Sequence, residues 1–223
     1  MTPLGPLWEF LLFLFIINNF HFILKFISFG KIFGWKTFER TTTAGKRGEK
    51  IVKNHIKSIA RKGDVLLENF YTNELGGGEV DFILISGKQA LVFEVKNIKG
   101  KVSGNIDDSH WNFGNKKYYN PIQQNKNHIK KIKPLFEKKG FEVEEYFNIV
   151  YLPNKSSKDI NVSLKGKTNC FVFNKKRSLK TFWKTKKKEN YNLSSMKRVL
   201  KTYTKENKKN KKRYLKKIKK QYN

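Results

Sequence analysis

Apolar residues recur with a helical period in two stretches of the chain. In the first stretch, Val52, Ile56 and Ile59 share one face while lysines occupy the other, which predicts an amphipathic helix that ends at Gly63. The second stretch begins at Asn120, a capping residue followed by a proline that suits the first helical turn. The expected buried side of this second helix consists of Ile122, Ile129, Ile132 and Phe136.

Other segments have the composition of strands, with alternating or continuous apolar residues between turn signals. These segments are 64–72, 79–85, 90–96, 145–152 and 170–173. The polar turn SGKQ joins the second and third of them, which predicts a hairpin, whereas residues 100–119 have a looser pattern. The order helix, strands, helix, strands predicts a mixed α/β domain of roughly 140 residues.

The most hydrophobic part of the chain is its beginning. Fifteen uncharged residues separate Glu9 from Lys25. They would form about 22 Å of helix, which a snorkelling lysine could extend toward the ~30 Å core of a bilayer. Basic residues follow this run, so the positive-inside rule places the rest of the chain in the cytoplasm. We therefore expect residues 1–36 to be a single transmembrane anchor, with a buried or membrane-surface helix as the alternative.

The charge of the chain is strongly positive and concentrated near its end. The formal net charge is +30, and residues 175–223 hold 21 lysines and arginines against two acids. Such a charge predicts a polyanionic partner, either nucleic acid or an anionic membrane surface. The alternative for this lysine-rich tail is a solvated helix or a disordered end. The predicted division is an anchor at 1–36, a folded domain at 37–174 and a basic helical tail at 175–223.

Charged side chains interrupt one face of the predicted hairpin. Side chains alternate along a strand, so Glu94 and Lys96 share a face, and pairing brings Asp81 across from them on that face. Burying an unpaired carboxylate costs several kcal/mol, so two converging acids suggest a divalent cation between them. Oxygen ligands and a lone cysteine, Cys170, favour Mg²⁺ or Mn²⁺ over zinc. The alternative is a common surface Glu–Lys pair worth under ~1 kcal/mol.

Three further features support a site around this face. Glu49 lies in the first turns of the first predicted helix, although an acid there also suits the helix dipole. Gln124 and His128 lie four residues apart on one face of the second helix, where solvent exposure is the ordinary alternative. Trp111 stands in the looser stretch, where the ordinary role of an indole is to fill a core.

Taken together, these residues form an ordered pattern. The pattern consists of Gly45, Gly48 and Glu49; Glu79, Val80 and Asp81; Val92 to Asn97; Gly100, Gly104 and Trp111; and Asn120, Pro121, Gln124 and His128. Over residues 42–152 it resembles the nuclease-related domain (NERD), a branch of the restriction-endonuclease-like PD-(D/E)xK superfamily. The resemblance implies an α/β fold with a mixed sheet flanked by helices. The active site that it implies is Glu49, Asp81, Glu94 and Lys96, with Gln124 as an accessory residue.

The expected function is therefore a Mg²⁺- or Mn²⁺-dependent nuclease, with DNA as the expected substrate, held at the cytoplasmic membrane face. Asp81 and Glu94 are the expected metal ligands, Glu49 completes or supports the site, and Lys96 positions the attacking water. The tail would add sequence-independent contacts to phosphates. The alternative is a nucleic-acid-binding or membrane-tethering module that uses the same fold without turnover.

Overall fold

The computed structural model describes residues 43–72, 78–138, 140–166, 168–186 and 207–213. The chain divides into two compact units, Met1–Ala44 and Gly45–Asn223, and the fold described below is that of the second. The predicted anchor, residues 1–36, lies outside the described residues. Within the described ranges, no helix combines the length and the apolar character needed to cross a membrane.

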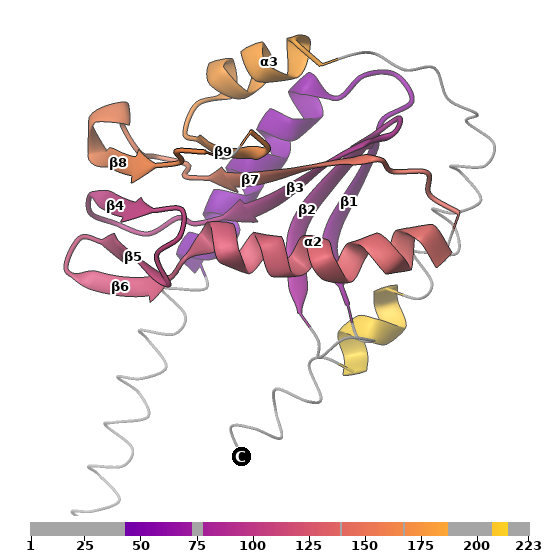
Figure 1. The fold of residues 1–223 in the computed structure, drawn as a ribbon, viewed down its shortest axis with the longest axis horizontal. Coiled ribbons are helices and arrows are strands. Elements are labelled where there is room, and N and C mark those ends of the chain that lie inside the picture. The colour runs from indigo at the N-terminus through magenta and orange to yellow at the C-terminus, as the bar shows by residue number, and fades with distance from the viewer. Residues whose placement is uncertain (1–42, 73–77, 139, 167, 187–206, 214–223) are drawn as a thin grey trace, which may run out of the picture. The chain divides into compact units, whose positions relative to one another are not determined.

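A mixed sheet forms the centre of the described fold, with the strand order β1-β2-β3-β7-β9 (Figure 1). Its strands are β1 Val65–Tyr71, β2 Glu79–Ser86, β3 Gln89–Val95, β7 Glu145–Tyr151 and β9 Cys170–Phe173. The first three pair antiparallel, and β7 and β9 are parallel to β3. All five predicted strands are confirmed, as is the hairpin between β2 and β3.

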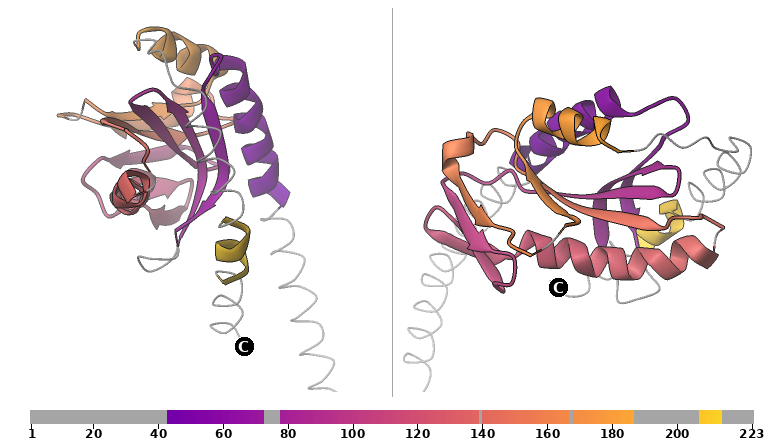
Figure 2. Two further views of the ribbon diagram at one scale, coloured as in Figure 1. Left: turned by 90° about the vertical axis from the view of Figure 1, so that its right-hand side faces the viewer. Right: turned by 45° about the horizontal axis from the view of Figure 1, so that its top comes forward.

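Helices cover both faces of this sheet (Figure 2). A helix over residues 43–59 packs Val52, Ile56 and Ile59 against one face, so its predicted apolar side is confirmed. Helix α2, Pro121–Lys138, covers the other face through Ile132 and Phe136. The two faces of each strand therefore serve two separate cores, which explains why β2 and β3 are apolar on both sides.

The packed core continues beyond residue 174, where the lysine-rich tail was predicted to begin. Helix α3, Lys176–Lys184, buries Leu179 and Trp183 in the same core as the helix over 43–59. Arg61 fixes this contact: its guanidinium lies 4.4 Å from the Trp183 ring centroid and donates 2.6 Å to the Trp183 carbonyl. The first turns of the basic segment are thus part of the folded domain.

Three strands of a second sheet occupy the loosely patterned stretch 100–119, and a later strand completes it. Its order is β6-β5-β4-β8, with strands β4 Val102–Asn105, β5 His110–Phe113, β6 Lys116–Tyr119 and β8 Ile160–Ser163. A short 3₁₀ turn, Ser157–Asp159, precedes β8. Trp111 is fully buried in the core of this sheet and donates 2.8 Å to the Asn105 carbonyl, so the core-filling interpretation of this residue is confirmed.

Asn120 joins the second sheet to helix α2. Its Oδ1 accepts 2.9 Å from the Ile122 amide, which confirms the predicted cap. Its Nδ2 donates to the carbonyls of Asn105, Ile106 and Asp108 at 3.2, 3.0 and 2.7 Å. One fully buried amide therefore holds both the start of α2 and the loop that follows β4.

Gly104 allows the Trp111 ring to lie directly on the backbone of β4. A Cβ at this position would lie 2.3 Å from Trp111 Cδ1. We expect Gly104→Ala to destabilise the fold by about 1–3 kcal/mol, because the indole is too well enclosed to move away. Gly45→Ala is the matched control, since a Cβ there meets nothing within 4 Å and alanine favours a helix. Thermal unfolding followed by circular dichroism measures both, and equal midpoints would contradict the packing argument.

Candidate active site

Strands β2 and β3 place two carboxylates opposite each other. Phe82 pairs with Phe93, and the same antiparallel register, continued by one step, sets Asp81 across from Glu94. Their side chains follow the buried residues Ile83 and Val92 on the α2 side of the sheet. The predicted common face is therefore present in the structure.

Lys96 and a backbone amide partly offset the negative charge of this pair. The Val95 amide donates 2.7 Å to Asp81 Oδ2. Lys96 Nζ lies 2.7 Å from Glu94 Oε1 and donates 3.0 Å to Gln124 Oε1 on α2. The sequence also allowed Glu94 and Lys96 to be an ordinary surface ion pair. Glu94 is only 3% exposed, so the pair is enclosed instead.

His128 completes the cover over Glu94. It lies one turn after Gln124 on α2, is 8% exposed, and its Nε2 is 3.7 Å from Glu94 Oε2. Burial, with Lys131 and Lys96 nearby, lowers the pKa of His128 to about 4, so the ring is neutral at pH 7 and this contact is not an ion pair. His128 was part of the sequence pattern but not of the predicted site, because four-residue spacing does not show that a face is buried.

Buried amides hold α2 where Gln124 and His128 reach the sheet. Asn125 donates 2.7 Å to the Val92 carbonyl and 2.9 Å to Asn148 Oδ1. Asn148 in turn donates 2.9 Å to the Ile122 carbonyl. These bonds join α2 to β3 and β7 next to the carboxylates, and buried polar groups that are paired in this way specify one packing arrangement.

The surroundings of Asp81 and Glu94 disfavour the charged forms of both carboxyl groups. Burial first, and the neighbouring Glu94 charge second, raise the pKa of Asp81 well above its ordinary value. Burial also raises the pKa of Glu94, although Lys96 opposes that shift. Glu94 Oε2 is buried and has no hydrogen-bond partner among the described residues. An unpaired buried oxygen beside a second carboxylate is a site that favours a bound cation.

Glu49 lies at the edge of this cluster. Gly48 brings its helix onto the chain after β3, since a Cβ on Gly48 would lie 2.5 Å from the Asn97 Cβ. Burial and the Glu79 charge raise the pKa of Glu49, while Lys46 lowers it. Glu49 in turn contributes to the raised pKa values of both Asp81 and Glu94. The predicted residue is therefore within electrostatic range of the pair.

The donor set fits a hard divalent cation. Across the described ranges, no group of three His, Cys, Asp or Glu side chains is spaced to hold a metal ion by itself. A Mg²⁺ ion, however, is commonly held by one or two carboxylates, with waters and substrate phosphates completing its shell. Asp81 and Glu94 provide such a pair, and the role of Glu49 as a further ligand stays a prediction.

A pocket of about 400 Å³ opens beside the carboxylates. It is lined by Gly78, Glu79, Asp81, Tyr119, Gln124, Asn127, His128 and Lys131. Tyr119 is 46% exposed, and Asn127 donates 3.3 Å to its hydroxyl, so both belong to the rim. The sequence did not single out Tyr119, Asn127 or Lys131, since their place depends on where α2 crosses the sheet.

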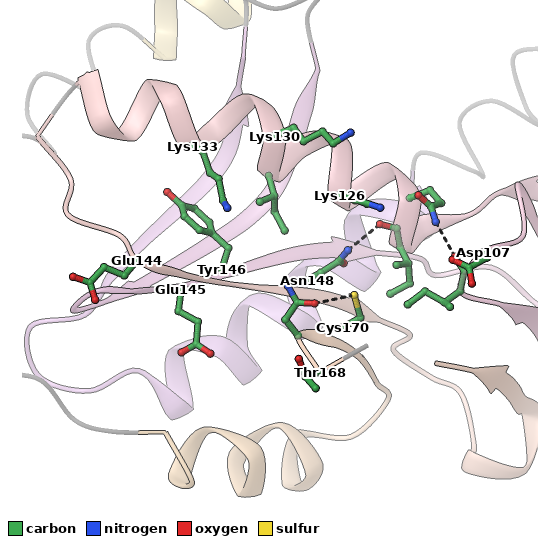
Figure 3. A pocket seen from close by; sticks show the side chains of 15 residues that line it. Asp107, Lys126, Lys130, Lys133, Glu144, Glu145, Tyr146, Asn148, Thr168 and Cys170 are labelled. Carbon is green, nitrogen blue, oxygen red and sulfur yellow. Dashed lines mark hydrogen bonds between the residues drawn. The ribbon is translucent and has the colours of Figure 1, made fainter. Parts of the chain in front are cut away.

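A second groove, of about 630 Å³, contains none of the predicted site residues (Figure 3). It is lined by Lys126, Lys130 and Lys133 of α2 together with Tyr146, Asn148 and Cys170. Acidic residues Glu144 and Glu145 lie at the same groove, so its lysines do not form a uniformly positive surface. The smaller pocket, which includes Asp81, is the candidate active site.

A family match classifies this α/β domain as nuclease-related. Residues 44–153 match the nuclease-related domain family, NERD, and this part of the chain belongs to that family. An uncharacterized protein from Bacillus anthracis is 31% identical over 129 residues, which are 55% of this chain and 59% of that protein. The chain thus spans less than two thirds of that relative. No solved structure matches the chain.

The raised pKa of Asp81 leads to a test in the absence of metal. The folded state holds the Asp81 proton more tightly than the unfolded state does, so ionisation above about pH 4 lowers the stability of the metal-free protein. We expect Asp81→Asn to raise the melting temperature at pH 7 in EDTA, with the gain shrinking as the pH falls toward 4. Asparagine keeps an acceptor for the Val95 amide.

The control for this test is Asp107→Asn, which neutralises an exposed carboxylate away from the site. Little change in melting temperature is expected there, because exposed substitutions seldom matter. An Asp81→Asn protein that melts below wild type at pH 7 in EDTA would show that the carboxylate pair is not repulsive.

Proposed function

We propose that the chain is a Mg²⁺- or Mn²⁺-dependent nuclease that hydrolyses phosphodiester bonds, with DNA as its substrate. The observation that carries this proposal is a pair of carboxyl groups at an open pocket, which the half-buried Asp81 lines. Glu94 beside it is buried and contacts Lys96, and its Oε2 has no hydrogen-bond partner among the described residues. The match to a nuclease-related family supports the same function.

The carboxylates and Lys96 have separate roles. Asp81 and Glu94 would hold the metal, which polarises the scissile phosphate and lowers the pKa of an attacking water. Lys96 has three N–H donors, and its contacts to Glu94 and Gln124 orient the ammonium group. A donor held in this way can position a water or stabilise the charge that develops on the phosphate.

Gln124 and His128 are positioning residues in this scheme. Gln124 accepts from Lys96 and restricts its side chain, whereas the neutral His128 covers Glu94 without neutralising it. Glu49 would raise the negative potential at the metal and support its binding.

The charge of the chain supports a nucleic acid as substrate. With a net charge of +30, the protein attracts polyanions, and each phosphate neutralised contributes about 0.9 log units of affinity per log unit of salt. The same charge would suit a nucleic-acid-binding module without turnover, so cleavage is the property that separates these two functions.

Cleavage of a supercoiled plasmid by the full-length chain, with Mg²⁺ or with EDTA, tests the proposal. We expect nicking with Mg²⁺ only, and losses of about 100-fold or more for Glu94→Ala and for Lys96→Ala, because preorganised charges of this kind usually contribute that much. A panel of single-stranded DNA and RNA defines the substrate class.

A second Lys–Glu pair provides the control for this experiment. Lys88 and Glu144 are 2.6 Å apart and exposed near the opposite end of β3, so Lys88→Ala and Glu144→Ala should leave cleavage unchanged. Activity that persists in Glu94→Ala and Lys96→Ala, or in EDTA, would exclude this site. Metal-independent binding without any cleavage would favour the non-catalytic module.

We also propose that residues 1–36 anchor the protein in a membrane, with the nuclease domain on the cytoplasmic side. The support is the uncharged run between Glu9 and Lys25 and the basic residues after it. Full-length protein should sediment with carbonate-washed membranes, and Phe15→Arg should release it, because a central arginine costs about 2.5–3.5 kcal/mol on insertion. Leu4→Arg, outside the run, is the control. Wild-type protein in the supernatant would refute the anchor.

A further inference from the structure

Residues 207–213 form a short helix with two distinct sides. Asn207 and Asn210, three positions apart, are half-buried and lie on the side that faces strand β1. The exposed residues of this helix are cationic: Lys208, Lys209, Lys211, Lys212 and Arg213. The segment is thus organised like an amphipathic helix in which side-chain amides replace the apolar face.

The two asparagines bind the outer edge of β1. Asn207 Oδ1 accepts 3.0 Å from the Tyr71 amide, and Asn207 Nδ2 donates 3.0 Å to the Asn69 carbonyl. Asn210 Nδ2 donates 3.4 Å to the Tyr71 carbonyl. A side-chain amide has one acceptor and a donor group, so Asn207 binds this edge as a neighbouring strand would.

The docking point coincides with an irregularity in β1. Asn69 has a left-handed backbone with φ of 47°, and the ladder with β2 has pairs at Glu68 and Phe70 on either side of it. Such a conformation is unfavourable for most residues and is tolerated by asparagine. The helix therefore binds an irregular position of an edge strand. The Tyr71 amide and the Asn69 carbonyl find their hydrogen-bond partners in the Asn207 side chain rather than in a neighbouring strand.

Tyr71 links the docked helix to the candidate active site. Asn69 Nδ2 and the Tyr71 hydroxyl both donate to Glu79 Oε1, at 2.9 and 2.7 Å. Glu79 lines the pocket together with Asp81. Lys211 Nζ lies 6.0 Å from the Tyr71 ring centroid, at the outer limit of a cation–π contact.

We infer that the helix 207–213 is a nucleic-acid clamp built into the rim of the catalytic pocket. Its cations bind backbone phosphates that flank the bond in the pocket, and its asparagines hold those cations in place against β1. The inference rests on the proposed function only in taking nucleic acid as the ligand. It assigns this segment a fixed position, which a general polycationic tail would not need.

The electrostatics of the pocket make such a clamp useful. Asp81, Glu94, Glu49 and Glu79 form a negative cluster that repels phosphate groups. Cations of a helix docked on Asn69 and Tyr71, both of which bind Glu79, would counter that repulsion where the nucleic-acid strand enters. A docked group also acts at a high effective concentration, whereas a flexible tail distributes the same charges over a large volume.

The double variant Asn207→Ala/Asn210→Ala tests the clamp in the full-length chain, because it removes the docking amides and leaves the net charge unchanged. The measurement is fluorescence anisotropy of a labelled 30-base-pair DNA duplex in EDTA, so that binding is read without cleavage. We expect binding at least threefold weaker than wild type. Hydrogen exchange at the Tyr71 amide should become faster, since its acceptor is Asn207.

Two further variants complete the experiment. Lys208→Gln/Lys209→Gln/Lys212→Gln should weaken binding and lower the salt slope by up to about 0.9 for each phosphate that the variant no longer neutralises. Asn112→Ala/Asn161→Ala removes two exposed amides from the second sheet and should change neither property.

Three other outcomes would overturn the clamp. Unchanged DNA binding with faster exchange at Tyr71 would mean that the helix only covers a sheet edge. Unchanged exchange would mean that the asparagines do not dock it, and tighter binding would mean that the helix obstructs the pocket. Weaker binding in a protein that never cleaves DNA would support the clamp and reject the nuclease, so the two failures remain distinct.

Discussion

The constraint on which the candidate site depends is the enclosure of two carboxyl groups, the buried Glu94 and the half-buried Asp81, in surroundings that disfavour their charged forms. Asp81 and Glu94 face each other across β2 and β3, next to the buried apolar residues Ile83 and Val92 on the same face. Two neighbouring groups act against this cost, because the Val95 amide donates to Asp81 and Lys96 contacts Glu94. Glu49 acts in the opposite direction and raises the pKa of both carboxyl groups. Such a pair lowers the stability of the metal-free domain, and a bound cation would raise that stability again.

Helix α2 supplies the side chains that pack around this pair. The Asn120 amide holds its first turn, and the Asn125–Asn148 bonds fix it to β3 and β7. With the helix held at these points, Gln124 reaches Lys96 and His128 reaches Glu94. The same buried amides therefore specify both the packing and the chemistry of the pocket.

The basic end of the chain has two structural roles in the described residues. Its first helix, α3, is part of the core through Trp183, and residues 207–213 bind the edge of β1 through Asn207. Both contacts attach the positively charged segment to the same domain that carries the acids. Part of the charge that composition alone would assign to a free tail is in this way held on the folded domain.

The sequence by itself determined the elements whose signal is local. The alternation around Asp81 and Glu94 predicted their common face, and Asn120 predicted the start of α2, because strand period and helix capping depend on a few adjacent residues. The ordered motif also identified the family over residues 44–153.

Only the tertiary structure decided the remaining features, because each depends on contacts between distant segments. The second sheet has four-residue strands with almost no periodicity, and β4 pairs with β8 more than fifty residues later. His128 is buried, and Asn207 meets Tyr71, only because packing brings α2 over the sheet and the end of the chain back to its edge. Burial and long-range pairing are properties of the assembled core, and no local pattern contains them.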